Sequence, residues 1–319
     1  MKVAVIGAAG YAGGELLRLL FQHPMITEVQ CISQSQVGKP LSSVHDDMYI
    51  YPNKTFAGDL HSCDVAFLCG DHGQSQELIQ RHDVYHRAPR VIDLSQDFRN
   101  GSNGFVYGLS EVYAEAIRGS VRVANPGCFA TAIQLALAPL AHKGLLHEPV
   151  HITAITGSTG AGQKLQKTSH FSQRSQNMST YKVFDHQHLT EIRRTLTELS
   201  GTTALPELYF VPVRGPFTRG IIASLYTPYQ GSDSDLLSLY QDYYARAPFV
   251  HVSVEEANLK SVINTNHVRL HVQKHEGLVH VVACLDNLLK GASGQAIQNL
   301  NLMMDWPLDS GLQLKPIAY

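Results

Sequence analysis

The amino-terminal segment restricts the fold of this chain more than any other. Val3–Ile6 is a continuous apolar run that predicts a buried strand, Gly7, Gly10 and Gly13 follow, and Glu15–Leu20 predicts a helix. A dinucleotide site has this order of strand, glycine turn and helix, with the pyrophosphate resting on the helix N-terminus. Glycine turns also join strands to helices without a ligand, and the spacing is G-x-x-G-x-x-G rather than G-x-G-x-x-G. Directly after an apolar strand, nucleotide binding is the better interpretation.

The rest of the chain predicts two domains of different texture. Strands expected at 28–33, 65–69, 91–94 and 121–123 alternate with helical stretches, which predicts a parallel, doubly wound α/β sheet. After Cys128 the strands are β-branched and predict a mixed α+β domain, with strands expected at 150–156, 208–213, 221–226 and 250–254 and two more after Ser261. The helical C-terminal segment is expected to return to the first domain. We therefore predict a Rossmann-type domain over 1–127 and 286–319, interrupted by an α+β domain over 128–285.

Composition excludes several classes of partner. A length of 319 residues suits two domains, and the net charge of −2 gives no electrostatic case for nucleic acid or an anionic membrane. No apolar stretch reaches the length of a membrane span. The five cysteines lie apart without a C-x-x-C pair, so neither a disulfide framework nor a cysteine zinc site is indicated. A cytoplasmic protein is expected.

The chain has 17 histidines, which raises the question of a metal. His267, His271 and His275 alternate with aliphatic residues, so they are expected on one face of a strand. A solvated outer face explains this pattern without a metal. We assign no metal site.

Cys128 is the candidate nucleophile. Pro126-Gly127 predicts a tight turn and Phe129 onward predicts a helix, so Cys128 is expected at the first helical position. Unpaired backbone N–H groups and the helix dipole at that position favour the thiolate, which is the nucleophilic form. The alternative is a buried structural cysteine, which needs no Pro-Gly turn before it.

A proton shuttle for this thiol is expected among His186, His188 and Glu191. If the segment is extended, the two histidines share a face and Glu191 can orient one ring. The alternative is a polar loop before a helix that begins near Thr190.

Further candidates could bind phosphate or other anions. The glycine-rich loop 156–164, which contains Gly160, could cradle a phosphate or face the thiolate, or be only a flexible loop. Arg99 and Arg219 are candidates to grip anionic oxygens, with surface cations as the alternative. Ser33, at the end of the second strand, is followed by neutral side chains and by Lys39 rather than by an acidic residue, which favours NADP over NAD.

Several motifs together resemble one family, the N-acetyl-γ-glutamyl-phosphate reductases. The chain carries, in this order, GAAGYAGGELLRLL, DLSQDFR, YGLSE, NPGCFAT, TGSTGAG, DHQHLTEI, FVPVRGPFTRGI and DNLLKGASGQAIQNLN. The resemblance implies NADPH-dependent reduction of N-acetyl-γ-glutamyl phosphate to N-acetylglutamate 5-semialdehyde with release of phosphate, in arginine biosynthesis. It also implies a Rossmann domain interrupted by an α+β domain that makes the contacts of a homodimer or homotetramer.

The same resemblance implies roles for particular residues. Cys128 is the nucleophile, one of His186 and His188 is its acid/base partner, and Glu191 orients that histidine. We favour His188, which precedes Glu191 in the H-x-H-x-x-E pattern. The implied cofactor contacts are Gly7, Gly10, Tyr11, Ala12 and Gly13 at the pyrophosphate, Ser33 at the adenosine 2′-phosphate, Gly160 in the glycine-rich loop, and Asn287, Gly291 and Gly294 on the nicotinamide side. The implied substrate contacts are Arg99, Asn125 and Arg219.

The chain also departs from the family pattern, and other functions stay open. Gln34 stands where family members commonly have an arginine, and Gln163 where an arginine or lysine often follows S-G-A-G. The nearest alternative is a sister aspartate- or aminoadipate-semialdehyde dehydrogenase, the latter acting on a carrier-bound substrate. An alternative of another class is a non-catalytic NADP-sensing protein.

Overall fold

The computed structural model describes residues 1–202 and 204–317 and divides the chain into two compact units. One unit comprises 1–127 and 292–313, and the other comprises 128–291 and 314–317. The chain passes from the first unit to the second between Gly127 and Cys128 and returns to the first at Ala292. Asp286 and Asn287 stay in the second unit because they hydrogen-bond Arg219 and Gly220 there.

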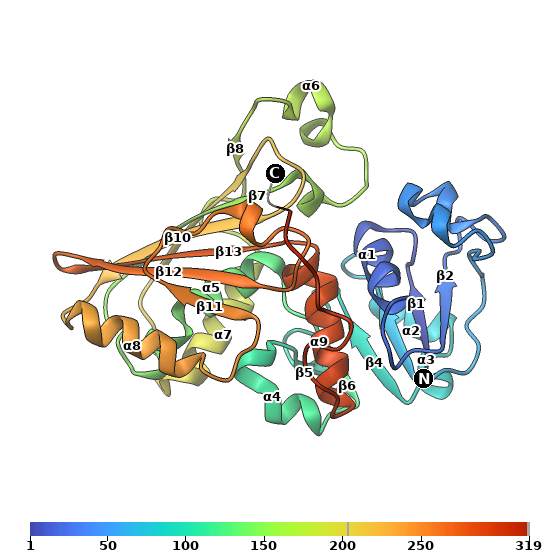
Figure 1. Cartoon of the computed structure of the whole chain (residues 1–319), viewed down its shortest axis with the longest axis horizontal. Coiled ribbons are helices and arrows are strands. Elements are labelled where there is room, and N and C mark those ends of the chain that lie inside the picture. Colours follow the sequence, from blue (N-terminus) through green and yellow to red (C-terminus); the bar gives the residue numbers. More distant parts are fainter. Residues whose placement is uncertain (203, 318–319) are drawn as a thin grey trace. The chain divides into compact units, whose positions relative to one another are not determined.

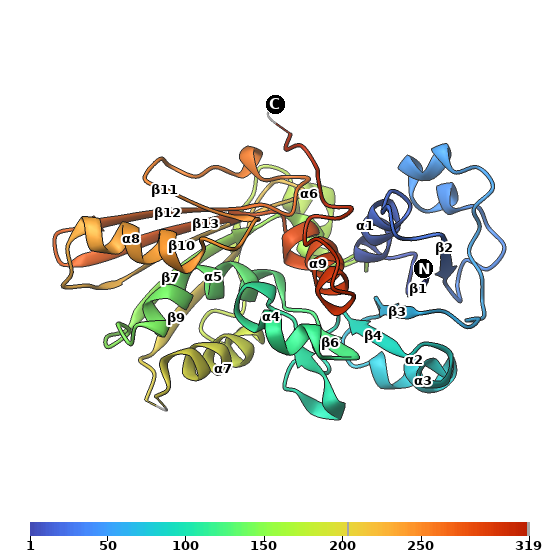
Figure 2. The ribbon, with the colours of Figure 1, turned by 60° about the horizontal axis from the view of Figure 1, so that its bottom comes forward.

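The first unit is a doubly wound α/β domain. Its six-stranded sheet has the order β2-β1-β3-β4-β6-β5, and every pair in it is parallel. Figure 2 shows α1 and α9 on one side of this sheet and α2 and α3 on the other. Its strands are β1 (Lys2–Ile6), β2 (Glu28–Ile32), β3 (Val65–Leu68), β4 (Arg90–Asp93), β5 (Val106–Tyr107) and β6 (Arg122–Ala124). Its α-helices are α1 (Tyr11–Leu20), α2 (Ser75–Arg81), α3 (Val84–Arg87), α4 (Ser110–Arg118) and α9 (Gly294–Met303), with 3₁₀ turns at Leu41–Ser43, Asp46–Ile50 and Ser102–Gly104.

The strand order predicts where a ligand binds in this unit. β1 lies between β2 and β3 in the sheet. The chain therefore winds towards one edge from β1 to β2 and towards the other edge from β2 to β3. In open α/β sheets, ligands bind at the carboxyl ends of the strands where the winding reverses. The glycine turn that follows β1 therefore lies at the expected binding point.

The second unit is a seven-stranded mixed sheet with helices on one face (Figure 1). Its order is β11-β12-β13-β10-β7-β9-β8, α5 packs on β10 and β13, α8 packs on β11 and β12, and α7 packs on α5. Its strands are β7 (Val150–Thr156), β8 (Ser179–Thr180), β9 (Leu208–Arg214), β10 (Ile221–Pro228), β11 (Val250–Ser253), β12 (Val268–His275) and β13 (Leu278–Leu285). Its α-helices are α5 (Cys128–His142), α6 (Phe171–Arg174), α7 (His188–Ser200) and α8 (Asp233–Tyr243), with 3₁₀ turns at Ser158–Ala161, Lys167–Ser169 and Leu259–Ser261 and a π-helical turn at Leu289–Ser293.

Some local expectations need correction. The two-residue strands β5 and β8 were not expected, because a pair of residues carries no detectable alternation. The helix after the histidine pair begins at His188 rather than near Thr190. The histidines of β12 do alternate with buried aliphatic residues, but His271 is buried rather than solvated, since its Nδ1 lies 3.1 Å from the carbonyl oxygen of Glu255. Among the described residues no helix is long and apolar enough to cross a bilayer.

Candidate active site

The glycine turn of the first unit has the backbone geometry that a pyrophosphate needs. Gly7 has φ = 88°, and a Cβ at this position would lie 2.6 Å from the carbonyl oxygen of Cys69, so only glycine fits. Gly10 precedes α1, and within the described part of the chain no side chain caps that helix, which leaves its first N–H groups for an anion. Tyr11 is 39% exposed, while the carbonyl oxygen of Ala12 accepts a hydrogen bond from Ser293 Oγ. The residues present therefore fit a dinucleotide.

Close packing holds this turn on the sheet. A Cβ at Gly13 would lie 2.6 Å from the carbonyl oxygen of Gly7, so α1 lies directly against the turn. His45 Nε2 lies 2.8 Å from the carbonyl oxygen of Ala8. His45 escaped the sequence prediction because nothing near it in the sequence links it to the turn.

The segment after β2 contains Ser33, which the sequence predicts at the adenosine 2′-phosphate. Ser33 is buried, and its backbone N–H donates to the carbonyl oxygen of Ala57. Gln34 Nε2 donates to the carbonyl oxygen of Gly58, and Lys39 Nζ donates to Gln36 Oε1. Lys39 is therefore exposed in this segment, six residues after Ser33.

Buried amides hold the turn that precedes the candidate nucleophile. Asn125 is 1% exposed, its Nδ2 donates to the carbonyl oxygen of Ala292, and its Oδ1 accepts from Asn299 Nδ2. Arg99 is also buried, and its Nε donates to the carbonyl oxygen of Asn125 while its Nη2 donates to that of Leu94. The sequence predicts substrate contacts for Arg99 and Asn125, and in the structure both make hydrogen bonds that shape this turn.

Cys128 is the first residue of α5, as the Pro-Gly turn predicts. The π-helical turn after β13 lies against it, because a Cβ built at Gly291 would come within 2.7 Å of Cys128 Cβ. The backbone N–H of Gly291 donates to the carbonyl oxygen of Asp286, which fixes this close approach. Gly291 is predicted to lie on the nicotinamide side, and in the structure it borders the thiol.

The two predicted histidines are adjacent, and they lie beside the start of α5. Their ring centroids are 4.6 Å apart, and the ring of Phe129 lies 5.6 Å from that of His186 and 6.3 Å from that of His188. The backbone N–H of His188 donates to His186 Nδ1. His188 Nε2 lies 3.9 Å from Glu191 Oε1, and both side chains are buried. The structure therefore brings together the three residues in which the sequence predicts the shuttle.

Electrostatics determine the protonation state of the His186 ring. Burial lowers the pKa of His186 to about 4, and the positive charges of Lys182 and Arg214 act in the same direction. His186 is therefore neutral near pH 7. Because its Nδ1 accepts the N–H of His188, the ring proton of the neutral form is on Nε2.

A second polar cluster lies at the ends of β9, β10 and β13. Arg219 Nε donates to Asp286 Oδ2 at 3.1 Å, and Arg219 Nη2 lies 3.0 Å from the same oxygen in an ion pair. Asn287 accepts from the backbone N–H of Gly220 and donates to Thr159 Oγ1. Gly160 lies in the 3₁₀ turn that follows β7, in the same unit. The carboxylate of Asp286 was not expected, although it directly precedes the predicted Asn287 in the sequence.

Two further residues missed from the sequence adjoin the histidine pair. The ring of Tyr181 lies 5.8 Å from that of His186. The Arg214 guanidinium lies over the Tyr181 ring, with Cζ 4.8 Å from its centroid. Burial and then the negative charge of Cys128 raise the pKa of Tyr181, while Arg214 opposes this shift. In the sequence, Tyr181 lies in the polar loop before the histidine pair and Arg214 lies in the FVPVRGPFTRGI motif. Neither position indicates a role.

Comparisons with known proteins agree with this arrangement. The family model described as "Semialdehyde dehydrogenase, NAD binding domain" matches residues 2–120, and the one described as "Semialdehyde dehydrogenase, dimerisation domain" matches 128–287. Aspartate semialdehyde dehydrogenase II from Vibrio cholerae has the same fold, with a TM-score of 0.72 at 17% identity over 95% of this chain and 98% of that one. An aspartate semialdehyde dehydrogenase from Candida albicans, solved with NADP, gives a TM-score of 0.67 at 13% identity over 95% and 98%. The two family models together match most of the chain, which therefore belongs to the semialdehyde dehydrogenases.

Curated relatives narrow the class to one branch. The N-acetyl-γ-glutamyl-phosphate reductase of Phocaeicola vulgatus is 45% identical over the full length of both chains. That of Bacteroides fragilis is 44% identical, again over both full lengths. The chain belongs to the N-acetyl-γ-glutamyl-phosphate reductase family.

Proposed function

We propose that this protein reduces N-acetyl-γ-glutamyl phosphate to N-acetylglutamate 5-semialdehyde and phosphate with NADPH, in arginine biosynthesis. The observation that carries the proposal is the cluster of Cys128 at the start of α5 with His188 and Glu191 beside it, in a chain of this family. The uncapped glycine turn after β1 holds the pyrophosphate of the cofactor.

The chemistry begins at the thiol. The helix start favours the Cys128 thiolate, and the thiol proton passes to His188. The thiolate attacks the acyl carbon, the carbon–oxygen bond to the phosphoryl group breaks, phosphate leaves, and a thioester forms on the enzyme. NADPH supplies the hydride that reduces this thioester. The resulting thiohemiacetal collapses to the aldehyde, and the histidine returns the proton to sulfur.

His188 is the acid/base residue of this proposal. A shuttle must change its charge near neutral pH, and burial keeps the His186 ring neutral down to about pH 4. His188 also faces a carboxylate, since its Nε2 lies 3.9 Å from Glu191 Oε1. Glu191 stabilises the imidazolium, and His186 positions His188 by accepting its backbone N–H.

The remaining predicted residues divide into ligand contacts and positioning residues. Arg219 contacts the substrate and is aimed by its ion pair with Asp286. Arg99 and Asn125 act through the turn before Cys128, because their polar atoms are used within the protein. Gly291 packs against Cys128, and Asn287 holds the backbone of Gly220.

A homodimer through the open face of the seven-stranded sheet completes the proposal. The helices cover one face, and the side chains of the other remain partly exposed, including Tyr209 (39%) and Tyr226 (45%). His151 lies between them, with ring centroids 5.3 Å and 5.0 Å away. Light scattering tests the oligomer: Tyr226→Glu should give a monomer, and the control Tyr49→Glu, in the first unit, should not.

A cytoplasmic location accompanies the function. All five cysteines are free thiols, which suits a reducing compartment. Cell fractionation with a tagged chain tests this: recovery of the protein outside the cytoplasmic fraction would contradict it.

The enzymatic test runs the reaction in reverse. With NADP and phosphate, the purified protein should oxidise N-acetylglutamate 5-semialdehyde in preference to aspartate or aminoadipate semialdehyde, and NADP should be preferred to NAD. Cys128→Ser should abolish turnover while leaving NADPH binding nearly intact, as measured by fluorescence titration. Substantial turnover by Cys128→Ser would refute the thioester mechanism.

A further inference from the structure

Arg214, the last residue of β9, lies on the face of the sheet that carries the catalytic cluster. Side chains alternate along a strand, and Phe210 and Pro212, of the same parity, are buried on the face that α5 covers. The ring of Phe210 lies 5.3 Å from that of Phe129 and 5.4 Å from that of His186. Arg214 therefore continues this row of side chains at the end of the strand.

The guanidinium of Arg214 is held over the ring of Tyr181, which adjoins the histidine pair. Its Cζ lies 4.8 Å from the centre of the Tyr181 ring, a geometry in which the ring face attracts the cation. The Tyr181 ring lies 5.8 Å from that of His186, which in turn lies 5.6 Å from that of Phe129, the residue after Cys128. The backbone of Arg214 is also fixed, since it pairs with Thr156 and Ser179 and its carbonyl oxygen accepts from Arg174 Nη1.

The guanidinium of Arg214 lacks a carboxylate partner among the residues that the structure describes. Within residues 1–202 and 204–317, no carboxylate pairs with its guanidinium, although the side chain is half-buried. Arg219, by contrast, is paired with Asp286, and Arg193 with Glu207. A partly desolvated cation without a counter-charge attracts an anion from solution more strongly than a neutralised one.

We infer that Arg214 is a substrate-binding residue, and that its guanidinium contacts an anionic oxygen of the acyl-phosphate substrate beside Cys128. The inference rests on the proposed function for the identity of the substrate, which carries a phosphoryl group and a carboxylate. Either group offers the planar or tetrahedral oxygens that a guanidinium binds in a fork. Arg214 then supplies the positive charge that Arg219 shares with Asp286.

A labelling experiment tests the cation without requiring turnover. Burial raises the pKa of Cys69 and of the other buried thiols, to about 11 at Cys63 and about 12 at Cys31 and Cys284, so alkylation near neutral pH reports on Cys128. The rate ratio of anionic iodoacetate to neutral iodoacetamide, read on the Cys128 peptide, measures the local attraction for anions.

Arg214→Leu should lower this ratio about tenfold, the effect of one unit charge a few ångströms away in a partly solvated site. Arg214→Lys should keep most of it, because the charge remains. The matched control Arg193→Leu, on α7, should leave it unchanged, because that arginine pairs with Glu207 away from the thiol. Thermal denaturation checks that each variant is folded.

Reverse-direction kinetics identify the anionic group. Arg214→Leu should raise the KM of inorganic phosphate or of the semialdehyde by about tenfold or more, as expected for a lost charge-assisted hydrogen bond. A change in the KM of phosphate assigns Arg214 to the phosphoryl group, and a change in that of the semialdehyde assigns it to the carboxylate, with the KM of NADP unchanged.

The outcomes separate this inference from the proposed function. If wild-type protein shows no reductase activity but Arg214→Leu still lowers the labelling ratio, the function is wrong and the anion site stands. If the folded Arg214→Leu protein keeps both the wild-type labelling ratio and the wild-type KM values, the inference is overturned.

Discussion

Gly291→Ala should disable the thiol by steric displacement alone. A Cβ at this position would lie 2.7 Å from Cys128 Cβ and 3.2 Å from its Cα, whereas two carbons in contact prefer about 3.5–4.0 Å. One of the two backbones must therefore move by about 1 Å. Gly291 has no positive φ, so the added methyl group introduces no backbone strain of its own.

The expected magnitude follows from this displacement. A misplacement of about 1 Å at a reacting group costs on the order of a hundredfold in rate, and overpacking of a well-filled region costs about 1–3 kcal/mol in stability. We therefore expect kcat/KM to fall about a hundredfold while the folded state survives at room temperature.

The assay compares three proteins. Steady-state kinetics, alkylation of Cys128 and thermal denaturation are measured for wild type, Gly291→Ala and the control Gly277→Ala. The control lies where an added Cβ meets no atom within 4 Å, so it should match wild type in all three. Wild-type kcat/KM and an unchanged Tm for Gly291→Ala would refute the close packing of the π-helical turn on Cys128.

Three other predictions follow from buried polar groups. The His186 pKa of about 4 lies below the value of about 6.5 expected in the unfolded chain, so its contribution to the free energy of unfolding, at most about 3 kcal/mol, is present above pH 6.5 and lost as the pH falls towards 4. In urea denaturation, His186→Asn should therefore lose less stability than wild type between pH 6.5 and pH 4. An equal loss of stability in the two proteins would contradict this. Asp286→Asn leaves Arg219 without its charge partner and should cost about 3 kcal/mol, seen as a lower Tm than that of the exposed-pair control Glu198→Gln. Asn299→Leu removes the hydrogen bonds to Gly108 and Asn125 and should cost about 2 kcal/mol in urea denaturation, and a neutral effect would mean that the amides are not needed.

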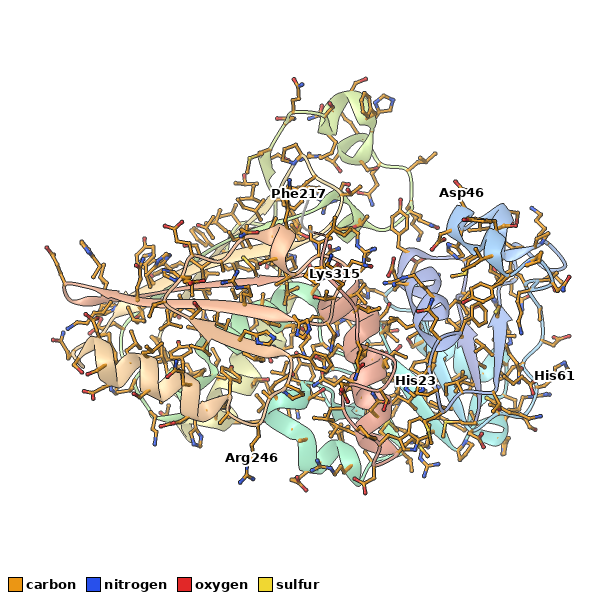
Figure 3. The ribbon with its side chains drawn as sticks, viewed as in Figure 1. His23, Asp46, His61, Phe217, Arg246 and Lys315 are labelled. Atoms are coloured by element: carbon orange, nitrogen blue, oxygen red, sulfur yellow. The ribbon has the colours of Figure 1, made fainter. Side chains whose placement is uncertain are left out.

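Much of the fold could be predicted from the sequence because it depends on local patterns. The apolar run before Gly7 and the alternating runs after Ser261 mark strands through the spacing of their side chains, and they correspond to β1, β12 and β13. Pro126-Gly127 likewise predicts that α5 begins at Cys128, because a turn residue ends one element and starts the next. Contacts between side chains that are far apart in the chain were outside the reach of such patterns. An example in the first unit is His23, labelled in Figure 3, whose Nε2 lies 3.0 Å from Asn301 Oδ1.

The sequence by itself was enough to propose the nucleophile, the glycine turn and the histidine pair, since each is a short motif whose residue types suggest its chemistry. Only the tertiary structure decided which charges act on them. Burial lowers the pKa of His186, Asp286 pairs with Arg219, and Arg214 lies over Tyr181 without a carboxylate partner among the described residues. The physical reason is that pKa values and ion pairs depend on desolvation and on distances between segments that are far apart in the chain.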